Sequence, residues 1–191
     1  MKKINILLLT LIVFLFSCSE NLVTENTTQS DNIVEEQLYM SKEYSSDKIR
    51  NVSIVGHAST GKTTLNEQLL YIMGSIPKAG RIEDKNTISD FEEEEKERLI
   101  SIHTAVTYGE KGDIKINLFD CPGMGDFVGQ VRSALRVSEA AIVLIDSVDG
   151  IQMETEKMWK YANEYNTPRI VFVNKMDKEN ANFYKVITEV E

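Results

Sequence analysis

A glycine-rich segment at residues 56–63 constrains the fold of this chain more than any other feature. It reads G-H-A-S-T-G-K-T and fits the phosphate-binding loop pattern G-x-x-x-x-G-K-[ST] at every position. An apolar run at 52–55 precedes it, and apolar residues at helical spacing follow it over 65–73. Glycines let backbone N–H groups close around phosphates, and the helix N-terminus adds partial positive charge. The sequence therefore predicts a P-loop, in which Lys62 contacts the β- and γ-phosphates and Thr63 ligates Mg²⁺. The residues expected at the phosphates are Gly56, His57, Ala58, Ser59, Thr60, Gly61, Lys62, Thr63 and Thr64.

Two further motifs follow the P-loop, each at the end of an apolar run. D-C-P-G at 120–123 follows the run 114–119. There the Asp120 carboxylate can hold Mg²⁺ through water, and a glycine lets the backbone approach the γ-phosphate. N-K-M-D at 174–177 follows the run 170–173. Its carboxylate suits guanine, which offers a ring N–H and an exocyclic amine as paired donors. Three motifs in this order predict a site for GTP or GDP rather than ATP. The residues expected to select guanine are Asn174, Lys175 and Asp177.

At these motifs the chain resembles the translational GTPases of the elongation factor G type. His57, the T-T-L continuation of the P-loop, R-S-A-L-R-V at 132–137 and P-R-I-V-F-V-N-K-M-D at 168–177 all fit that family. D-F-V-G at 126–129 is similar to the elongation factor G-like paralogues. The resemblance covers about two thirds of the chain, from residue 51 to 178. It implies the P-loop GTPase G domain of a much longer protein, with Mg²⁺ as cofactor and the ribosome as a partner.

Two departures from that family bear on catalysis. Met124 stands where the family has the histidine that orients the attacking water, and a thioether makes no useful hydrogen bond. The first switch of the family reads R-G-I-T-I, whereas R-L-I-S-I here puts Ser101 in place of the metal-binding threonine and Leu99 in place of glycine. Because phosphoryl transfer depends on positioned groups, we expect nucleotide binding, slow GTP hydrolysis at most, and a stiffer switch. The resemblance implies catalytic roles for Lys62, Ser101 and Gly123, and Mg²⁺ ligation by Thr63, Ser101 and Asp120.

Charge adds less than the motifs do. The formal net charge of −9 argues against a general nucleic-acid surface, so no direct DNA binding is expected. The densest charge run, Glu92 to Glu95, falls within the expected switch at 75–103 and predicts a solvated, mobile segment.

The first 39 residues differ in character from the rest. M-K-K is a basic start, residues 4–16 are almost entirely apolar, and L-F-S-C ends at Cys18. A basic start followed by an apolar stretch too short to span a bilayer is typical of a secretory signal. The L-x-S-C ending resembles a bacterial lipoprotein cleavage box. We therefore expect a leader at 1–18 with lipidation and membrane attachment through Cys18, a disordered tether at 19–48, and a partial G domain at 49–191.

These parts of the chain point to different compartments. A G domain is expected in the cytoplasm, whereas a lipoprotein leader predicts an exported, membrane-anchored protein. The composition changes near Met40, and M-S-K there resembles the start of a separate reading frame. One interpretation is a leader joined to an elongation factor G-like gene, by genomic fusion or by an error in the gene model. Two others stay open: a truncated remnant that binds nothing, and an exported lipoprotein whose G-domain sequence is incidental.

Alternating strand and helix patterns predict a three-layer α/β fold with a mostly parallel sheet. The turn at 110–113 predicts one antiparallel hairpin, and the apolar run 142–145 predicts a strand buried on both faces. The family's domain continues with another strand, a loop and a helix, so we expect a C-terminally truncated and less stable domain with 169–173 as an exposed sheet edge. The expected strands are 52–55, 104–108, 114–119, 140–146 and 169–173, and the expected helices 62–73, 127–137, 152–165 and about 180–190.

Overall fold

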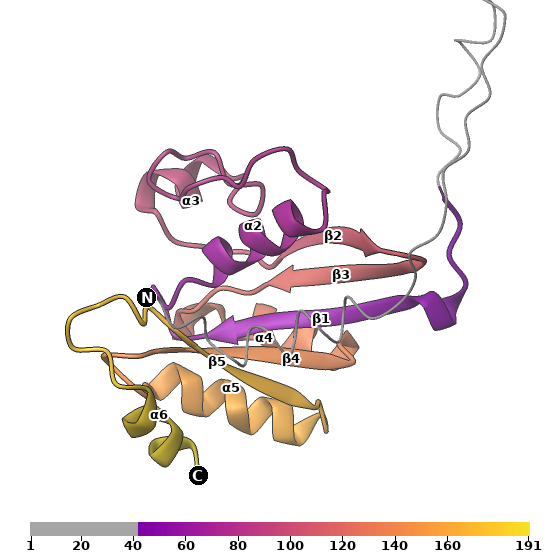
Figure 1. The fold of residues 1–191 in the computed structure, drawn as a ribbon. Helices are drawn as coiled ribbons and strands as arrows, with labels where there is room; N and C mark the ends of the chain where they lie inside the picture. The colour runs from indigo at the N-terminus through magenta and orange to yellow at the C-terminus, as the bar shows by residue number, and fades with distance from the viewer. Residues whose placement is uncertain (1–41) are drawn as a thin grey trace, which may run out of the picture. The chain divides into compact units, whose positions relative to one another are not determined.

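Five strands form one mixed sheet in residues 42–191, the part of the chain that this computed structural model describes (Figure 1). The strands are β1 (Ile49–Gly56), β2 (Ala105–Lys111), β3 (Ile114–Asp120), β4 (Ala140–Asp146) and β5 (Arg169–Asn174). They lie in the order β2-β3-β1-β4-β5. The β2–β3 hairpin is antiparallel and the other three neighbouring pairs are parallel. The mostly parallel sheet, the hairpin and the edge position of β5 are therefore confirmed for the described residues.

Helices cover both faces of the sheet, which confirms the three-layer architecture. The helices are η1 (Ser46–Lys48), α2 (Lys62–Ile72), α3 (Glu93–Arg98), η2 (Gly125–Phe127), α4 (Val128–Val137), α5 (Met153–Glu164) and α6 (Phe183–Val190). On one face α2 packs against β1, β2 and β3. On the other face α4 and α5 pack against β1, and α5 also packs against β4. Within residues 42–191, no helix is both long and apolar enough to cross a bilayer.

Of the segments expected before residue 49, the structure describes only residues 42–48. The expected leader, its Cys18 and the composition change at Met40 lie outside the described residues. The last residues of the expected tether lie within them, and Ser46–Lys48 forms a single 3-10 turn that leads into β1. Lys48 of this turn pairs with Asp113 of the β2–β3 hairpin at 2.6 Å. Among the described residues, regular structure thus starts at Ser46, three residues before the expected boundary at 49.

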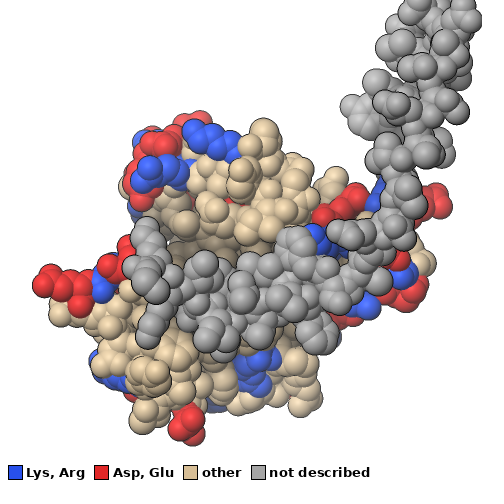
Figure 2. Space-filling view, viewed as in Figure 1, with Lys and Arg blue, Asp and Glu red and all other residues tan. Residues whose placement is uncertain are grey.

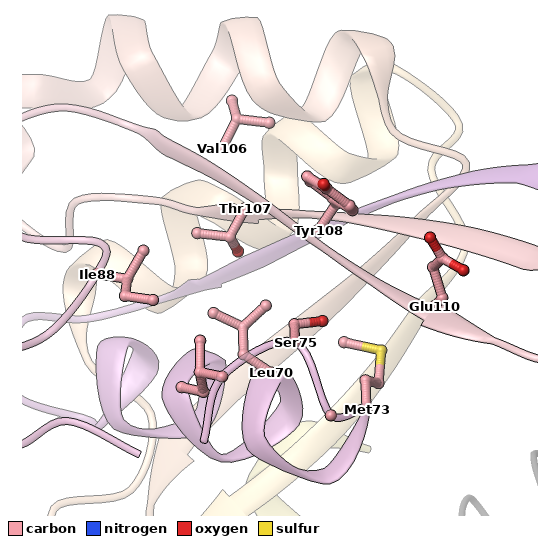
Figure 3. A pocket seen from close by; sticks show the side chains of 10 residues that line it. Leu70, Met73, Ser75, Ile88, Val106, Thr107, Tyr108 and Glu110 are labelled. Carbon is pink, nitrogen blue, oxygen red and sulfur yellow. The ribbon is translucent and has the colours of Figure 1, made fainter. Parts of the chain in front are cut away.

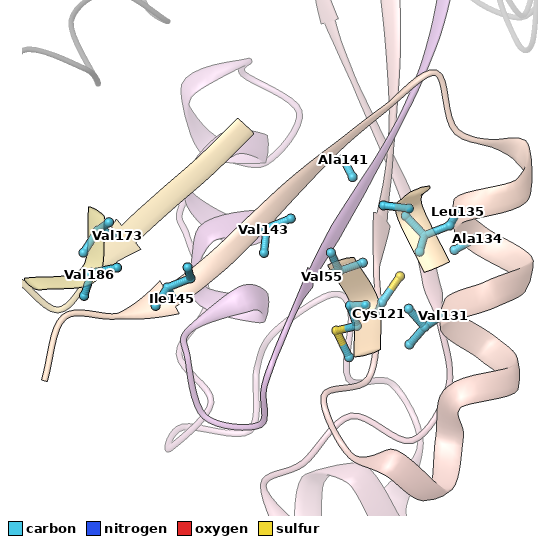
Figure 4. Close-up of a cluster of buried hydrophobic side chains, with 12 residues drawn as sticks. Val55, Cys121, Val131, Ala134, Leu135, Ala141, Val143, Ile145, Val173 and Val186 are labelled. Atoms are coloured by element: carbon cyan, nitrogen blue, oxygen red, sulfur yellow. The ribbon is translucent and has the colours of Figure 1, made fainter. Parts of the chain in front are cut away.

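The larger apolar core lies between the sheet and the helices α4 and α5 (Figure 4). The side of the sheet that these helices cover is called the α4–α5 face below. Val131 and Leu135 of α4 are fully buried and point toward Val55 of β1 and Cys121. β4 carries Val143, Leu144 and Ile145, all at most 1% exposed, as expected of a strand covered on both sides. Burying such side chains is the main contribution to the stability of this face. The whole cluster contains Val55, Cys121, Val131, Ala134, Leu135, Ala141, Val143, Ile145, Met158, Ala162, Val173 and Val186.

The opposite face has a smaller apolar core and more buried polar groups. Its apolar cluster consists of Leu70, Ile76 and Leu118, with partly buried side chains around them. Of the apolar residues at 65–73, Ile72 is 55% exposed and Leu65 is only half-buried. The helix also buries polar side chains at Asn66 and Glu67, both 0% exposed. Apolar spacing therefore located the helix but did not indicate its buried polar side chains.

Candidate functional site

The P-loop joins β1 to α2 in a backbone shape that requires its glycines. Gly56 has φ 149°, and a Cβ there would lie 2.4 Å from the Leu144 carbonyl oxygen. Gly61 caps α2 in the left-handed region at φ 98°. A Cβ on Gly61 would lie 2.5 Å from the side-chain nitrogen of Asn174. Any larger residue at either position would therefore both strain the backbone and displace a neighbour.

The side chain of Lys62 is curled over this loop. Its Nζ donates a hydrogen bond to the His57 carbonyl at 2.8 Å, and the residue is only 6% exposed. Burial lowers the pKa of Lys62 to about 8, although the nearby Asp120 carboxylate acts in the opposite direction. A buried ammonium with a single carbonyl acceptor gains strongly from an anion at the loop. The Lys62 ammonium can therefore replace its hydrogen bond to the His57 carbonyl with one to an anionic ligand at the loop.

Hydroxyl groups from two distant segments meet at the start of α2. Thr63 Oγ1 and Ser101 Oγ lie 3.2 Å apart, which brings the P-loop and the switch segment together. Ser101 Oγ also donates to Asp90 Oδ1 at 2.8 Å. The sequence analysis expected Thr63 and Ser101 at one metal site, and the structure places them together.

Asp120, at the end of β3, is the most telling group of the site. The residue is 1% exposed, and neither carboxylate oxygen accepts a hydrogen bond of good geometry from the described residues, although the hydroxyls of Thr63 and Ser89 lie close to it. Burial raises the pKa of Asp120 to about 6, and the Thr63 hydroxyl, Lys62 and the Ser89 hydroxyl act in the opposite direction. Since buried polar atoms are almost always satisfied, this carboxylate fits a cation or its bound water. Carboxylate and hydroxyl oxygens are the donors that Mg²⁺ prefers, together with phosphate oxygens.

Asp90 is a residue of this site that the sequence analysis missed. It is 4% exposed, and it accepts from Ser101 at 2.8 Å and from Thr87 Oγ1 at 3.3 Å. Burial raises the pKa of its carboxyl group. The T-x-x-D spacing at 87–90 was visible in the sequence, but nothing in it showed that Ser101 would fold back onto Asp90. No cluster of three or more His, Cys, Asp or Glu side chains forms among the described residues, so a divalent ion here would depend on hydroxyls and on the ligand.

The N-K-M-D motif meets the P-loop through Asn174. Its Nδ2 donates to the Thr60 carbonyl at 2.8 Å, across 114 residues of chain. Lys175 has φ 60°, and its Nζ pairs with Asp146 at 2.7 Å. Asp177 is exposed at the same end of the sheet. The structure therefore uses Asn174 to brace the phosphate loop and leaves the Asp177 carboxylate open to solvent.

A cavity of about 360 Å³ opens at the P-loop. The predicted site residues that line it are Ala58, Ser59, Gly61, Lys62, Thr63, Thr64, Ser101, Gly123 and Lys175. The predicted residues Gly56, His57, Thr60, Asp120, Asn174 and Asp177 are not part of this lining. Ile82, Glu83, Asp90, Leu99, Ile100 and Met124 complete the wall.

Two wall residues are the departures noted in the sequence. Met124 is 37% exposed at the cavity, and Gly123 before it sits so close to the loop that a Cβ would lie 2.4 Å from Lys62 Nζ. Leu99 ends α3 in the left-handed region at φ 55°, a conformation that costs a non-glycine residue about 1–2 kcal/mol. A residue other than glycine therefore adopts the glycine conformation here, and the switch carries local strain.

The charge run of the switch is not uniformly solvated, which corrects the expectation for Glu92–Glu95. Glu93 to Arg98 form α3, and the surface over this helix gathers acidic and basic side chains (Figure 2). Glu95, however, is 1% exposed. Its Oε1 accepts from the backbone N–H groups of Ile102 and His103 at 2.9 and 3.0 Å, and its Oε2 accepts from Glu92. The run was misread because the capping-box pair was counted with the solvated charges.

A larger cavity of about 550 Å³ lies away from the P-loop (Figure 3). It is bounded by Leu70 and Met73 at the end of α2 and by Thr107 and Tyr108 on β2. Its charged lining is limited to Glu110, and none of the three motifs reaches it. The smaller cavity at the P-loop is therefore the candidate site, because it holds the positioned lysine, hydroxyls and carboxylates.

Comparison with known proteins shows the family of this part of the chain. Residues 47–191 match the family model described as the elongation factor Tu GTP binding domain. Over 143 residues the chain is 43% identical to elongation factor G 2 of Borreliella afzelii, covering 75% of this chain and 21% of that protein. It is also 43% identical over 139 residues to elongation factor G of Granulibacter bethesdensis, covering 73% of this chain and 20% of that protein. A crystal structure of a Thermus thermophilus protein superposes with a TM-score of 0.72 at 38% identity, covering 75% of this chain and 22% of the other.

Proposed function

Because the chain belongs to the elongation factor Tu GTP-binding domain family, we propose that it binds GTP and GDP at the P-loop cavity with Mg²⁺. The chain spans about a fifth of the length of the curated relatives it matches. The activity of those longer proteins therefore belongs to the proposal, and the G domain alone is what the comparisons share with this chain.

One observation carries the proposal. The buried carboxylate of Asp120 lies near the ammonium of Lys62, and the hydroxyls of Thr63 and Ser101 meet at the wall of the cavity beside it. A nucleotide phosphate with Mg²⁺ satisfies all of these groups at once, because the phosphate attracts the lysine and the ion attracts the oxygens. We propose Thr63 and Ser101 as direct ligands of Mg²⁺ and Asp120 as a ligand through water.

Different residues of the chain bind the phosphates, bind the guanine base and support the loop. Backbone N–H groups of residues 57–64 and Lys62 hold the phosphates. Asp177 accepts the paired donors of guanine, while Asn174 keeps the loop below it in place. Bound Mg²⁺ supplies positive charge that stabilises the transferring phosphoryl group. Met124 cannot orient a water molecule, so we propose that intrinsic GTP hydrolysis is slow.

Partners and compartment follow from the same premise. The two relatives named above are elongation factors, and we propose that this domain's partner is the ribosome. A guanine nucleotide domain meets its ligand in the cytoplasm, and that compartment is part of the proposal. A leader at 1–18 with lipidation at Cys18 remains a separate proposal, on residues outside the described part of the chain.

Titration of the full chain with a fluorescent GDP in Mg²⁺ tests the proposal. GTP and GDP are expected to displace the probe, and ATP at the same concentration is not. Asp177→Ala is expected to lower guanine affinity at least about tenfold, because two donors of the base lose their acceptor. The matched control is Glu179→Ala, an exposed acid two positions away that lies outside the motif. A folded wild-type chain that binds no guanine nucleotide would show that the domain is a remnant without function.

A further inference from the structure

A row of buried side chains, three of them polar, runs along one side of α2. Thr63, Asn66, Glu67 and Leu70 are spaced so that they share one face of the helix, and all four are at most 5% exposed. Thr63 belongs to the proposed metal site and Leu70 to the small apolar core. Asn66 and Glu67 have no role in the site described above. Both carry polar groups that burial makes costly unless they are bonded.

Glu67 connects two points of the switch segment, residues 80 and 88, to α2. Its Oε1 accepts from the Ile88 backbone N–H at 2.6 Å, and its Oε2 accepts from the Gly80 backbone N–H at 2.8 Å. Backbone N–H groups that donate to a carboxylate form stronger hydrogen bonds than those that donate to a neutral acceptor. A single side chain thus closes the loop 80–88 against α2. Gly80 is fitted to this contact, since a Cβ there would lie 2.5 Å from the Asn86 carbonyl oxygen and 2.9 Å from Glu67 Oε2.

Asn66 holds the next residue of the segment. Its Nδ2 donates to Ser89 Oγ at 2.7 Å, and its Oδ1 accepts from Thr107 Oγ1 at 3.0 Å. The amide therefore links the switch segment to β2 as well as to α2. Together the two side chains fix residues 80, 88 and 89 immediately before Asp90.

The fixed segment leads directly into the metal site. Asp90 follows Ser89 in the chain, and it accepts the hydrogen bond of Ser101, whose oxygen lies 3.2 Å from Thr63. Thr63 is one helical turn before Glu67 on the same face of α2. The structure therefore forms a closed circuit from α2 to the segment 80–89, to Asp90 and Ser101, and back to α2.

We infer that Asn66 and Glu67 are positioning residues of the metal site: they fix the segment 80–89 on α2 and thereby hold Asp90 and Ser101 beside Thr63. This inference rests on the proposed function, because the site it positions is the proposed Mg²⁺–nucleotide site. Asn66 and Glu67, together called the clamp, fix the position of the Ser101 hydroxyl oxygen in the nucleotide-free chain. Its loss is expected to weaken the Mg²⁺-dependent part of nucleotide binding and to leave the Mg²⁺-independent part unchanged.

The test compares the full wild-type chain with Glu67→Gln and Gly80→Ala. Glu67→Gln keeps the size of the side chain but sets an amide NH₂ against one of the two backbone donors. Gly80→Ala disturbs the same contact from the loop and leaves α2 unchanged, so it decides the question if Glu67→Gln fails to fold. Glu97→Gln is the control, because it removes one carboxylate from an exposed position of α3, within the same switch but outside the segment 80–89.

Two readouts are expected to move together in both clamp variants. Amide hydrogen exchange of residues 80–103 in the nucleotide-free chain becomes about tenfold faster, while exchange in α5 is unchanged. The Mg²⁺ concentration for half-maximal binding of a fluorescent GTP analogue rises about tenfold, while affinity in EDTA stays at the wild-type value. The control variant changes neither readout.

Opposite results separate this inference from its premise. If wild type binds the analogue and the clamp variants keep its Mg²⁺ requirement, the positioning role is wrong. An equal loss of affinity in Mg²⁺ and in EDTA overturns it too, because that pattern belongs to general destabilisation. A folded wild-type chain that binds no guanine nucleotide overturns the proposed function, and the metal-site role with it.

Discussion

The two faces of the sheet are built on different principles. The α4–α5 face is held by a large apolar cluster in which Leu135 and Val131 are fully buried. The α2 face has a small apolar cluster, and its switch segment is held by buried polar side chains: Asn66, Glu67, Asp90 and Glu95. The three nucleotide-binding motifs lie at the carboxyl ends of β1, β3 and β5, at the edge of the sheet between these two faces.

The difference predicts that the two faces respond differently to substitution. Apolar packing is non-directional and depends on the area removed from water, so the α4–α5 face has no single contact whose loss releases it. Hydrogen bonds to buried carboxylates are directional, and each one holds a specific stretch of backbone. We therefore expect single polar substitutions on the α2 face to release a defined stretch of backbone, whereas apolar substitutions on the opposite face lower the stability of the whole domain.

The largest expected effect compares the same substitution on both faces. Leu135→Ala removes a fully buried side chain from the large cluster and is expected to lower the free energy of unfolding by about 3 kcal/mol. Leu70→Ala in the small cluster is expected to cost about 2 kcal/mol, because fewer neighbours lose contact. Urea unfolding of the nucleotide-free chain measures both. Equal losses would show that the small cluster contributes as much as the large one.

The second test concerns the buried carboxylate where the faces meet. Asp120 has a folded pKa of about 6, raised from its ordinary value of 3.8, so its ionised form is unfavourable in the nucleotide-free fold. The wild-type chain therefore has this group's full stability below about pH 4 and loses it as the pH rises through about 6. Asp120→Asn is expected to be about 3 kcal/mol more stable than wild type at pH 7.5, and to bind nucleotide more weakly in Mg²⁺.

Urea unfolding between pH 4 and 8 checks the sign of that effect. The advantage of Asp120→Asn should shrink toward zero as the pH falls from about 6 to about 4. Asp126→Asn, at an exposed position of the same loop, serves as the control. A variant that is less stable than wild type at pH 7.5 would mean that the ionised Asp120 is stabilised, rather than penalised, in the native fold.

A smaller effect is expected at Glu95, which fixes the end of the switch. Glu95→Gln replaces one acceptor with an amide NH₂ that faces backbone donors, and is expected to destabilise the fold by about 1.5 kcal/mol. Hydrogen exchange should rise in residues 99–104 and not in α4. The exposed neighbour Glu93→Gln provides the comparison, and an equal effect there would restore the interpretation of a uniformly solvated charge run.

The smallest effect is expected at the strained end of α3. Leu99→Gly removes the cost of a left-handed leucine, about 1 kcal/mol or more, and adds part of it back as chain entropy in the unfolded state. The net expectation is a stabilisation of about 0.5 kcal/mol in urea unfolding. Leu99→Ala retains the strained backbone and should not be more stable than wild type. If alanine and glycine stabilise equally, strain at this residue is not the cause.

The sequence predicted the features that depend on local pattern. The P-loop at 56–63, the three-layer sheet and the hairpin at 110–113 follow from turn chemistry and apolar runs, and the structure confirms the fold. The polar face of α2 could not be predicted, because the bonds of Asn66 and Glu67 go to residues 80, 88, 89 and 107, which are distant in sequence. Asp90 was missed for a related reason. Its role depends on hydrogen bonds between segments that come together only in the folded domain.

The hydrogen bond between Asn174 and the Thr60 carbonyl also sets an order of assembly. It joins the last strand of the sheet to the first loop across 114 residues of chain, and contacts of such long sequence separation form slowly because closure of the intervening chain is costly. The phosphate loop therefore lacks one of its supports until β5 has joined the sheet beside β4. During synthesis, a chain that has not yet produced residue 174 holds the phosphate-binding sequence without its full brace. We therefore expect the affinity of the phosphate loop for a guanine nucleotide to rise once β5 has joined the sheet, because only then is this support in place.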